Sequence, residues 1–221
     1  MRRLRRMSSG GPWFVLVAGI NGAGKSTFAQ NRDTLRVLLD ARGPEIEVIN
    51  PDLITREILR SAPGLPTSDA NVRAADECER RVKNIIKGGQ RSFVIETVLS
   101  TEKYKPIVRT ALKRGFQVLF VYVVLSSVDE AIERVAARVH RGGHNVPVDK
   151  IRARWPRSLA NLPWFWQHST RALVYFNGSS EPKPILMAQR RGSDVWFALD
   201  APAPWALEPL LPKWRPRRRK P

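Results

Sequence analysis

The sequence is poor in cysteine and histidine and lacks a long apolar run. Its single cysteine, Cys78, excludes an internal disulfide and fits a protein of the reducing cytoplasm. Of three histidines, His144 stands beside Gly142-Gly143, where a role in a turn is favoured over catalysis. No apolar stretch reaches the roughly 18 residues that cross a bilayer. We therefore expect a cytoplasmic protein with no membrane partner.

Acidic residues are also scarce, since 20 Asp and Glu stand against 38 Lys and Arg, and the formal net charge is +18. We expect a basic tail over residues 1–11, one domain over residues 12–200 and a Pro- and Arg-rich tail over residues 201–221. Such tails would bind polyanions weakly, without specificity and in a salt-dependent way. The terminal cations are Arg2, Arg3, Arg5, Arg6, Lys213, Arg215, Arg217, Arg218, Arg219 and Lys220.

The strongest motif is a phosphate-binding loop (P-loop) at residues 19–26, which matches G-x-x-x-x-G-K-S/T. An apolar run precedes it as an expected strand, and residues 25–31 can continue as a helix. Lys25 would reach the β- and γ-phosphates of ATP, and the Ser26 hydroxyl would be a ligand of Mg²⁺. The predicted nucleotide-binding residues here are Gly19, Asn21, Gly22, Ala23, Gly24, Lys25, Ser26 and Thr27.

Strand-like and helix-like segments alternate along the chain. Apolar runs at residues 13–18, 46–49, 92–95, 116–125 and 173–176 predict five strands, and residues 184–190 and 195–199 a hairpin. Helices are expected over residues 53–60, 69–87, 106–114, 128–140 and 148–160, while structure beyond residue 201 is doubtful. This order predicts an α/β fold: a P-loop kinase-like three-layer sandwich with a mostly parallel five-stranded sheet, helices on both faces and a helical lid.

The longest expected helix carries its own signals. Asp69 can cap its start, and Gly88-Gly89 can end it. Helical spacing predicts one buried face that includes Cys78 as an inert core thiol. The residues of this face are Val72, Ala75, Cys78, Val82 and Ile85.

Two carboxylates follow strands at the edge that carries the P-loop. Asp52 follows the second expected strand, and Glu96-Thr97 follow the third. One carboxylate can act as general base on an acceptor hydroxyl, and the other can hold substrate or metal-bound water. The fourth strand ends in Ser126 without an acidic residue, which argues against a motor ATPase or a GTPase switch. This pattern favours a small-molecule kinase.

Arginines follow the fourth strand. Arg134, Arg138 and Arg141 share one helix face, and Arg154 lies in the next helix. In a closing lid their guanidinium groups would neutralise charge on the transferred phosphoryl group. The alternative is a solvated basic face in an arginine-rich chain.

A larger set of residues, in this order and spacing over residues 14–177, resembles the small zeta-toxin-like kinases. Its Asn-Pro-Asp, Glu-Thr and Gly-Gly-His elements are more specific than the P-loop alone. The matching residues are Gly19 to Ser26, Asn50-Pro51-Asp52, Phe93 to Thr97, Arg134-Val135, Arg138-Val139, Gly142-Gly143-His144, Val146-Pro147 and Arg157-Ser158-Leu159.

This resemblance implies a kinase that uses ATP and Mg²⁺ to phosphorylate a hydroxyl of UDP-N-acetylglucosamine, and a cognate antitoxin protein as partner. It implies Asp52 as catalytic base, Lys25 as phosphate ligand and Ser26 as metal ligand. Glu96 and Thr97 would bind the acceptor, while Arg138 and Arg154 would clamp phosphate. The chain is short for that family and lacks its sugar-binding insertions, so another nucleotide-like metabolite stays an alternative acceptor.

Two other functions compete with this interpretation. A kinase of nucleic-acid ends or of a nucleotide cofactor would suit the basic charge. A non-catalytic, nucleotide-gated binding module would use ATP to order the arginine-rich lid. The presence of both Asp52 and Glu96 speaks against the module.

Overall fold

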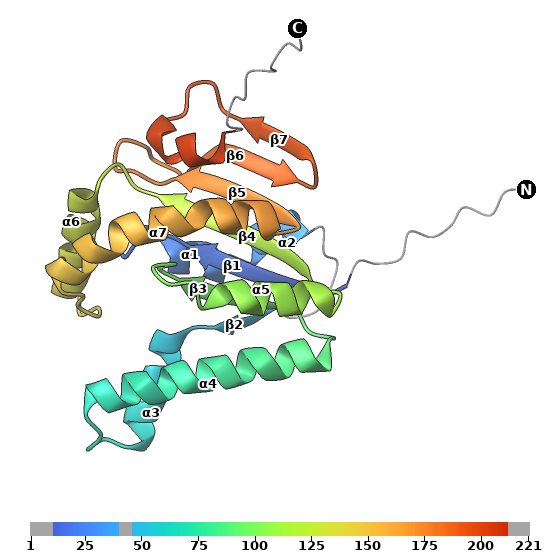
Figure 1. Ribbon diagram of the computed structural model, residues 1–221. Helices are drawn as coiled ribbons and strands as arrows, with labels where there is room; N and C mark the ends of the chain where they lie inside the picture. The colour runs from blue at the N-terminus through green and yellow to red at the C-terminus, as the bar shows by residue number, and fades with distance from the viewer. Residues whose placement is uncertain (1–10, 40–45, 212–221) are drawn as a thin grey trace, which may run out of the picture.

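The structure, a computed structural model, describes residues 11–39 and 46–211, so residues 1–10 and 212–221 of the predicted tails lie outside it. In these residues seven strands form one sheet in the order β2-β3-β1-β4-β5-β6-β7 (Figure 1). The first five are parallel, as predicted, and β6 and β7 add the expected antiparallel hairpin. The strands are β1 (Trp13–Ala18), β2 (Glu47–Ile49), β3 (Phe93–Thr97), β4 (Gln117–Val124), β5 (Arg171–Phe176), β6 (Ile185–Arg191) and β7 (Asp194–Phe197).

The central strands are apolar on both sides because helices cover both faces of the sheet. In β1, Phe14 and Leu16 belong to one core cluster, whereas Val15 and Val17 belong to the other. This alternation follows from the two-residue repeat of a strand. Phe14 stacks on Phe93 of β3 with ring centroids 4.7 Å apart.

The helices form the two outer layers. Helices α4, α5 and α7 contribute to the core on one face, with α3 packed against α4, and α1, α2 and α6 contribute on the other. Figure 1 shows α5 and α7 crossing in front of the sheet. The helices are α1 (Lys25–Gln30), α2 (Arg32–Leu39), α3 (Pro51–Ser61), α4 (Thr67–Gly88), α5 (Tyr104–Lys113), α6 (Val128–His140) and α7 (Val148–His168).

Two helix predictions were incomplete. Helix α2 was not predicted, and α7 was expected to end near residue 160 but continues to His168 through Pro156 and Pro163. Proline inside a helix removes a hydrogen bond and costs about 3 kcal/mol. Leu162 and Phe165 are fully buried in the core, and this tertiary packing outweighs that local cost.

The predicted start of α4 was wrong, and its buried face was predicted correctly only in part. Pro66 precedes its first residue, and Asp69 lies inside the first turn without capping it. Val72 is 62% exposed, and Ala75 is exposed as well. Val82 and Ile85 are buried as predicted, and Cys78 is half-buried and packs against the core. The helix also buries Ala70, Ala74 and Ile86, which were not predicted, because it packs on α3 as well as on the sheet. The predicted end was correct, with Gly89 in the left-handed conformation at φ 68.

Residues beyond 201 are more ordered than the sequence predicted. Two short 3₁₀ helices, Pro204–Ala206 and Glu208–Leu210, follow the hairpin. Ala203 and Ala206 are buried, and the ring of Trp205 lies 5.9 Å from that of Trp155 in α7. Within the described ranges, no helix combines the length and hydrophobicity needed to cross a membrane.

Candidate active site at the phosphate-binding loop

The P-loop connects β1 to α1, and Asn177, the residue directly after β5, holds it in place. The Asn177 amide donates a hydrogen bond of 3.0 Å to the Ala23 carbonyl oxygen. Gly24 has φ 87, and a β-carbon there would lie 2.6 Å from the Asn177 amide nitrogen. Only glycine therefore fits. Asn177 was not predicted as a site residue, although its position directly after β5 is a signal, because ligands bind at this edge of such sheets.

Lys25 lies at the centre of the site. Its ammonium donates a hydrogen bond of 2.9 Å to the Ile20 carbonyl oxygen. Burial lowers the pKa of Lys25 from its ordinary 10.5 to about 8; Glu96 opposes this shift, Arg138 adds to it, and Asp52 and Arg154 have smaller effects. The structure thus brings together five predicted site residues from five segments of the chain.

Glu96 joins the P-loop to the segment that carries Asp52. The Ser26 hydroxyl donates to one Glu96 carboxylate oxygen at 2.6 Å, and the Asn50 amide donates to the other at 2.9 Å. Asn50 also caps α3 by accepting a 2.8 Å hydrogen bond from the Asp52 backbone N–H. Asp52 itself is exposed to solvent. Both carboxylates therefore lie at the P-loop edge, where the sequence predicted them.

The contact between Ser26 and Glu96 bears on the missing acidic residue at the end of the fourth strand. In P-loop NTPases the loop Ser or Thr and a Walker-B Asp together hold Mg²⁺. Here the carboxylate beside the loop hydroxyl comes from β3, which pairs directly with β1, rather than from β4. The sequence signal was the apolar run of residues 93–95 that ends in Glu96.

Thr97 takes part in the turn after β3. Its hydroxyl oxygen accepts a 3.0 Å hydrogen bond from the Leu99 backbone N–H. Leu99 has φ 62, an unfavourable value for a residue with a side chain, and the Asn161 amide donates to its carbonyl oxygen at 2.9 Å. The contact seen for Thr97 is thus structural, and its predicted role toward the acceptor stays a prediction.

Three of the predicted arginines line a cavity of about 620 Å³ at the P-loop. Arg134, Arg138 and Arg141 all face it, so their helical spacing does place them together. The Arg138 guanidinium donates to the His144 carbonyl oxygen at 2.7 Å, and its buried Nε has no partner in the described residues. The other lining residues are Gly22, Gly24, Lys25, Ser26, Thr27, Ala137 and Gly143.

The Gly-Gly-His turn holds Arg138 in this position. A β-carbon on Gly143 would lie 2.5 Å from the Arg138 Cγ and 2.9 Å from its carbonyl oxygen. Gly143 also donates its backbone N–H to that carbonyl oxygen at 3.0 Å. A larger residue at this position would therefore displace Arg138, and the His144 side chain is not needed for the contact.

Glu130, which the sequence did not single out, positions Arg134. Its carboxylate forms an ion pair of 2.9 Å with the Arg134 guanidinium and accepts a hydrogen bond of 2.6 Å from the Ser179 hydroxyl. Burial alone would raise the pKa of Glu130, but hydrogen bonds from Ser179 and Ser126 hold it below its ordinary value. The carboxylate therefore stays ionised and keeps the guanidinium at the cavity.

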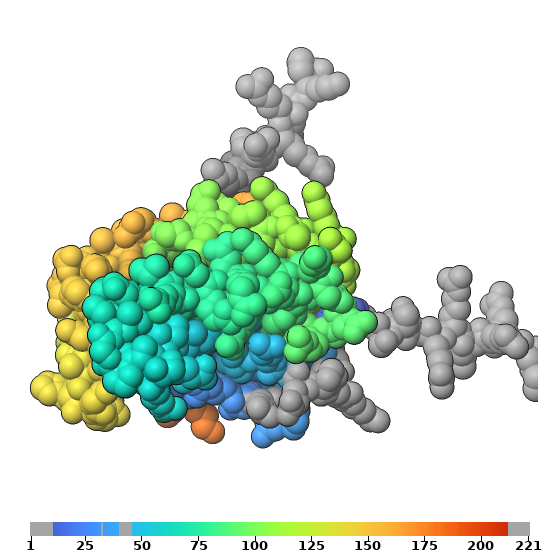
Figure 2. Space-filling model, turned by 90° about the horizontal axis from the view of Figure 1, so that it is seen from below, coloured from blue at the N-terminus to red at the C-terminus, as the bar shows by residue number. Residues whose placement is uncertain are grey.

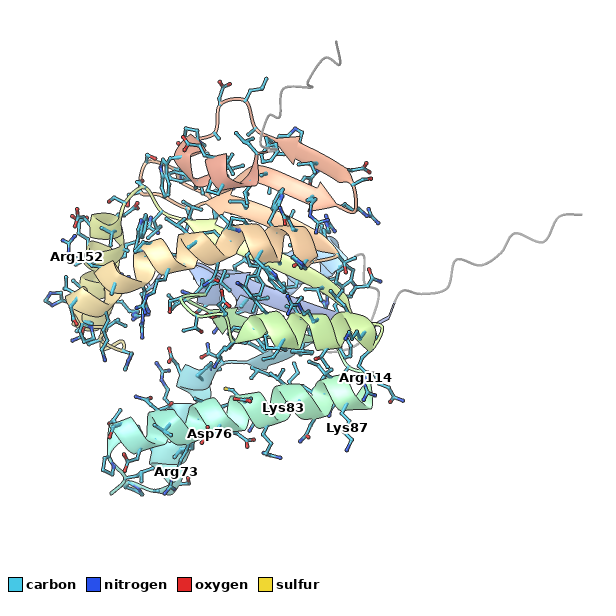
Figure 3. The ribbon with its side chains drawn as sticks, viewed as in Figure 1. Arg73, Asp76, Lys83, Lys87, Arg114 and Arg152 are labelled. Carbon is cyan, nitrogen blue, oxygen red and sulfur yellow. The ribbon has the colours of Figure 1, made fainter. Side chains whose placement is uncertain are left out.

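Arg154 approaches the P-loop from α7. Its guanidinium donates to the Asn21 amide oxygen at 3.3 Å. Its neighbour Arg152 forms an ion pair of 2.8 Å with Asp129 instead, and Figure 3 shows it at the outer end of α7. The sequence left two interpretations of these arginines, a phosphate-binding lid and a solvated basic face. The structure shows arginines of both kinds, some at the cavity and some on the solvated surface.

Comparison with known proteins adds a family and several structures of similar fold. A family model described as an AAA domain matches residues 14–163. An uncharacterized protein of Haemophilus influenzae is 28% identical over 142 residues, which cover 64% of this chain and 91% of that protein. AvrRxo1-ORF1:AvrRxo1-ORF2, solved with sulphate ions and with ATP, has a TM-score of 0.70 at 14% identity, covering 93% of this chain and 66% of that one. The chain thus spans just under two thirds of that structure's length.

Two further structures share the fold at lower similarity. The PezAT chromosomal toxin-antitoxin system of Streptococcus pneumoniae gives a TM-score of 0.55 at 16% identity, covering 79% of this chain and 72% of that one. The Pnkp1/Rnl/Hen1 RNA repair complex gives a TM-score of 0.53 at 19% identity, covering 86% of this chain and 53% of that one. At these identities the likeness establishes the P-loop kinase-like fold alone.

Proposed function

The chain belongs to the AAA domain family, and from this premise we propose that it is an ATP-dependent kinase with an alcohol group as acceptor. One observation carries the proposal. The P-loop lysine and hydroxyl lie beside two carboxylates and below three arginines, so charge binding and proton transfer are available in one place. A loop that only bound nucleotide would not need the exposed Asp52.

The residues present fit ATP and Mg²⁺. The cavity is cationic, and the Arg138 Nε, buried without a partner in the described residues, can be satisfied by an anion. The Ser26 hydroxyl and the Glu96 carboxylate offer the oxygen ligands that Mg²⁺ prefers. When bound, Mg²⁺ would neutralise charge on the β- and γ-phosphates.

In the proposed reaction Asp52 accepts the proton of the acceptor hydroxyl as its oxygen attacks the γ-phosphorus. The bond from that phosphorus to the β–γ bridging oxygen breaks, and ADP leaves. Lys25, Arg138 and Arg154 stabilise the negative charge on the phosphates during transfer. Asp52 suits the base because its carboxylate is exposed while Glu96 is engaged by Ser26 and Asn50.

For the acceptor we propose a UDP-amino sugar such as UDP-N-acetylglucosamine, or another nucleotide-like metabolite, bound near Glu96 and Thr97. The resemblance to zeta-toxin-like kinases supports this choice. We also propose a cognate antitoxin-like partner, since AvrRxo1-ORF1 was solved with ORF2 and PezAT is a toxin-antitoxin system.

The test is to incubate the purified protein with γ-labelled ATP, Mg²⁺ and a metabolite extract, and to identify the labelled product by mass spectrometry. A phosphorylated nucleotide sugar in the wild-type reaction, absent with Asp52→Asn, is the expected result. ATP binding without transfer to any acceptor would instead favour the nucleotide-gated binding module.

A second candidate is a kinase of nucleic-acid ends or of a nucleotide cofactor. The net charge of +18 favours it, and the similar fold in an RNA repair complex is consistent with it. Oligonucleotides with free hydroxyl ends, offered in parallel with UDP-N-acetylglucosamine, separate the two candidates by which acceptor is labelled.

A further inference from the structure

A second cavity, of about 480 Å³, lies between α4 and α5 and shares no lining residue with the arginine cavity. Figure 2, seen from below, shows α3 and α4 forming this side of the molecule with α5 beside them. The floor of the groove is apolar. It consists of Ile49, Val82, Ile86, Ile95, Tyr104 and Ile107.

Helix α4 contacts α3 much more extensively than it contacts the sheet, and the groove lies between α4 and α5. Val82 and Ile86, four residues apart on α4, face the groove together. Ile49 and Ile95 directly precede Asn50 and Glu96 in the chain, so the floor continues into the edge that carries the candidate catalytic carboxylates.

The rim of the groove is positively charged. Four cations line it: Lys83, Lys87, Lys103 and Arg114. The single acidic residue of the lining, Glu79, forms an ion pair of 2.6 Å with Lys83. Figure 3 shows Lys87 and Arg114 at the same end, at the ends of α4 and α5. Within the described ranges neither of these two cations has an ion-pair partner closer than 4.0 Å.

We propose that this groove binds a small anionic amphiphile, with an apolar chain or ring on the floor and a carboxylate, sulfate or phosphate at the Lys87 and Arg114 end. Its volume lies in the range of small-molecule sites, roughly 300–1,000 Å³. The lining stretch of α4 from Cys78 to Lys87 is about 14 Å long at 1.5 Å per residue, which accommodates an extended alkyl chain. None of the residues proposed to act in phosphoryl transfer lines this groove.

The first test uses the fluorescent probe 1-anilinonaphthalene-8-sulfonate with the full-length protein. Laurate should displace the probe, and dodecyltrimethylammonium, which has a similar chain but the opposite charge, should not. The double variant Lys87→Glu/Arg114→Glu should bind the probe at least about tenfold more weakly. Thr110→Trp should block the groove, because Thr110 is exposed and lines it.

Matched controls separate the groove from general charge and surface effects. Arg73→Glu changes an exposed cation of α4, and Lys113→Trp adds an aromatic ring to α5; neither residue lines the groove. Both should bind the probe as the wild type does. Equal melting temperatures across the set establish that all the variants are folded.

A second test uses Cys78, the only cysteine of the chain, which lines the groove. Burial raises the pKa of the Cys78 thiol to about 11, so alkylation is followed at pH 9, where laurate should slow it. Equal probe affinity in all variants, or equal competition by the cationic detergent, would overturn the proposal. So would displacement by an acidic amphipathic peptide but not by laurate, since the occupant would then be a partner's helix.

Discussion

The arginine cavity over the P-loop and the groove between α4 and α5 are built in opposite ways. The first lies where strands end, so turns and helix starts place a lysine, hydroxyls and arginines around it. The second lies along one face of the sheet, where β2, β3, α4 and α5 present apolar side chains. We infer that activity and stability depend on different parts of the molecule, and substitutions in each part test this separation.

The largest effect is expected from Asp52→Asn at the edge beside the P-loop. Asparagine keeps the shape of the side chain but cannot accept a proton, so turnover should fall by ~10²–10⁴-fold while ATP binding survives. Single-turnover phosphoryl transfer and ATP titration on one preparation measure both. Asp69→Asn, in the first turn of α4, is the matched control and should be silent. Wild-type turnover in the Asp52 variant would remove the assignment of a catalytic base.

Ile86→Ala tests the opposite side of the comparison. Ile86 is 5% exposed in the floor of the groove, and truncating it should lower the free energy of unfolding by about 2–4 kcal/mol. ATP affinity should stay within about twofold of wild type, because Ile86 does not line the arginine cavity. Val72→Ala on the exposed side of the same helix should change stability little. Denaturant titration with ATP binding on each variant checks the contrast, and a matching loss of ATP affinity would contradict it.

Arg138→Lys should affect turnover more than ATP affinity, with a loss in turnover on the order of 10–10²-fold. Lysine keeps the positive charge but cannot make the planar, two-pronged contact of a guanidinium with phosphate. Arg152→Lys is the control, since Arg152 pairs with Asp129 away from the cavity. Steady-state kinetics and nucleotide titration distinguish the two variants. If Arg138 belonged to a solvated basic face, both would behave as wild type.

The smallest effect concerns the pH dependence of stability at Lys25. The pKa of Lys25 in the folded protein is about 8, below its ordinary 10.5. Between these two pH values the unfolded chain binds more protons than the folded protein, so the stability of the wild type rises with pH. Lys25→Met lacks this contribution. The variant should therefore melt above the wild type at pH 7, and the difference should shrink above pH 8 and be nearly gone beyond pH 10.5. Calorimetry over this range tests it, and a difference that does not change with pH would contradict the lowered pKa of Lys25.

Many features of the fold could be predicted because they are written into short stretches of sequence. The P-loop follows its strand directly, and alternating apolar runs predicted the five parallel strands and the hairpin. The end of α4 at Gly89 was likewise local. The predictions failed where tertiary packing opposes a local signal, as in α7, which passes two prolines to bury Leu162 and Phe165.

For the candidate site, the sequence by itself determined which reactive residue types stand after which strands, because strand ends and turns are local features. Only the tertiary structure decided how they meet. Ser26 and Glu96 are 70 residues apart in the chain but 2.6 Å apart in space. The same holds for the groove, since no local pattern records how closely two helices approach on one face of a sheet. Such contacts depend on the packing of the whole chain, which brings distant segments into register.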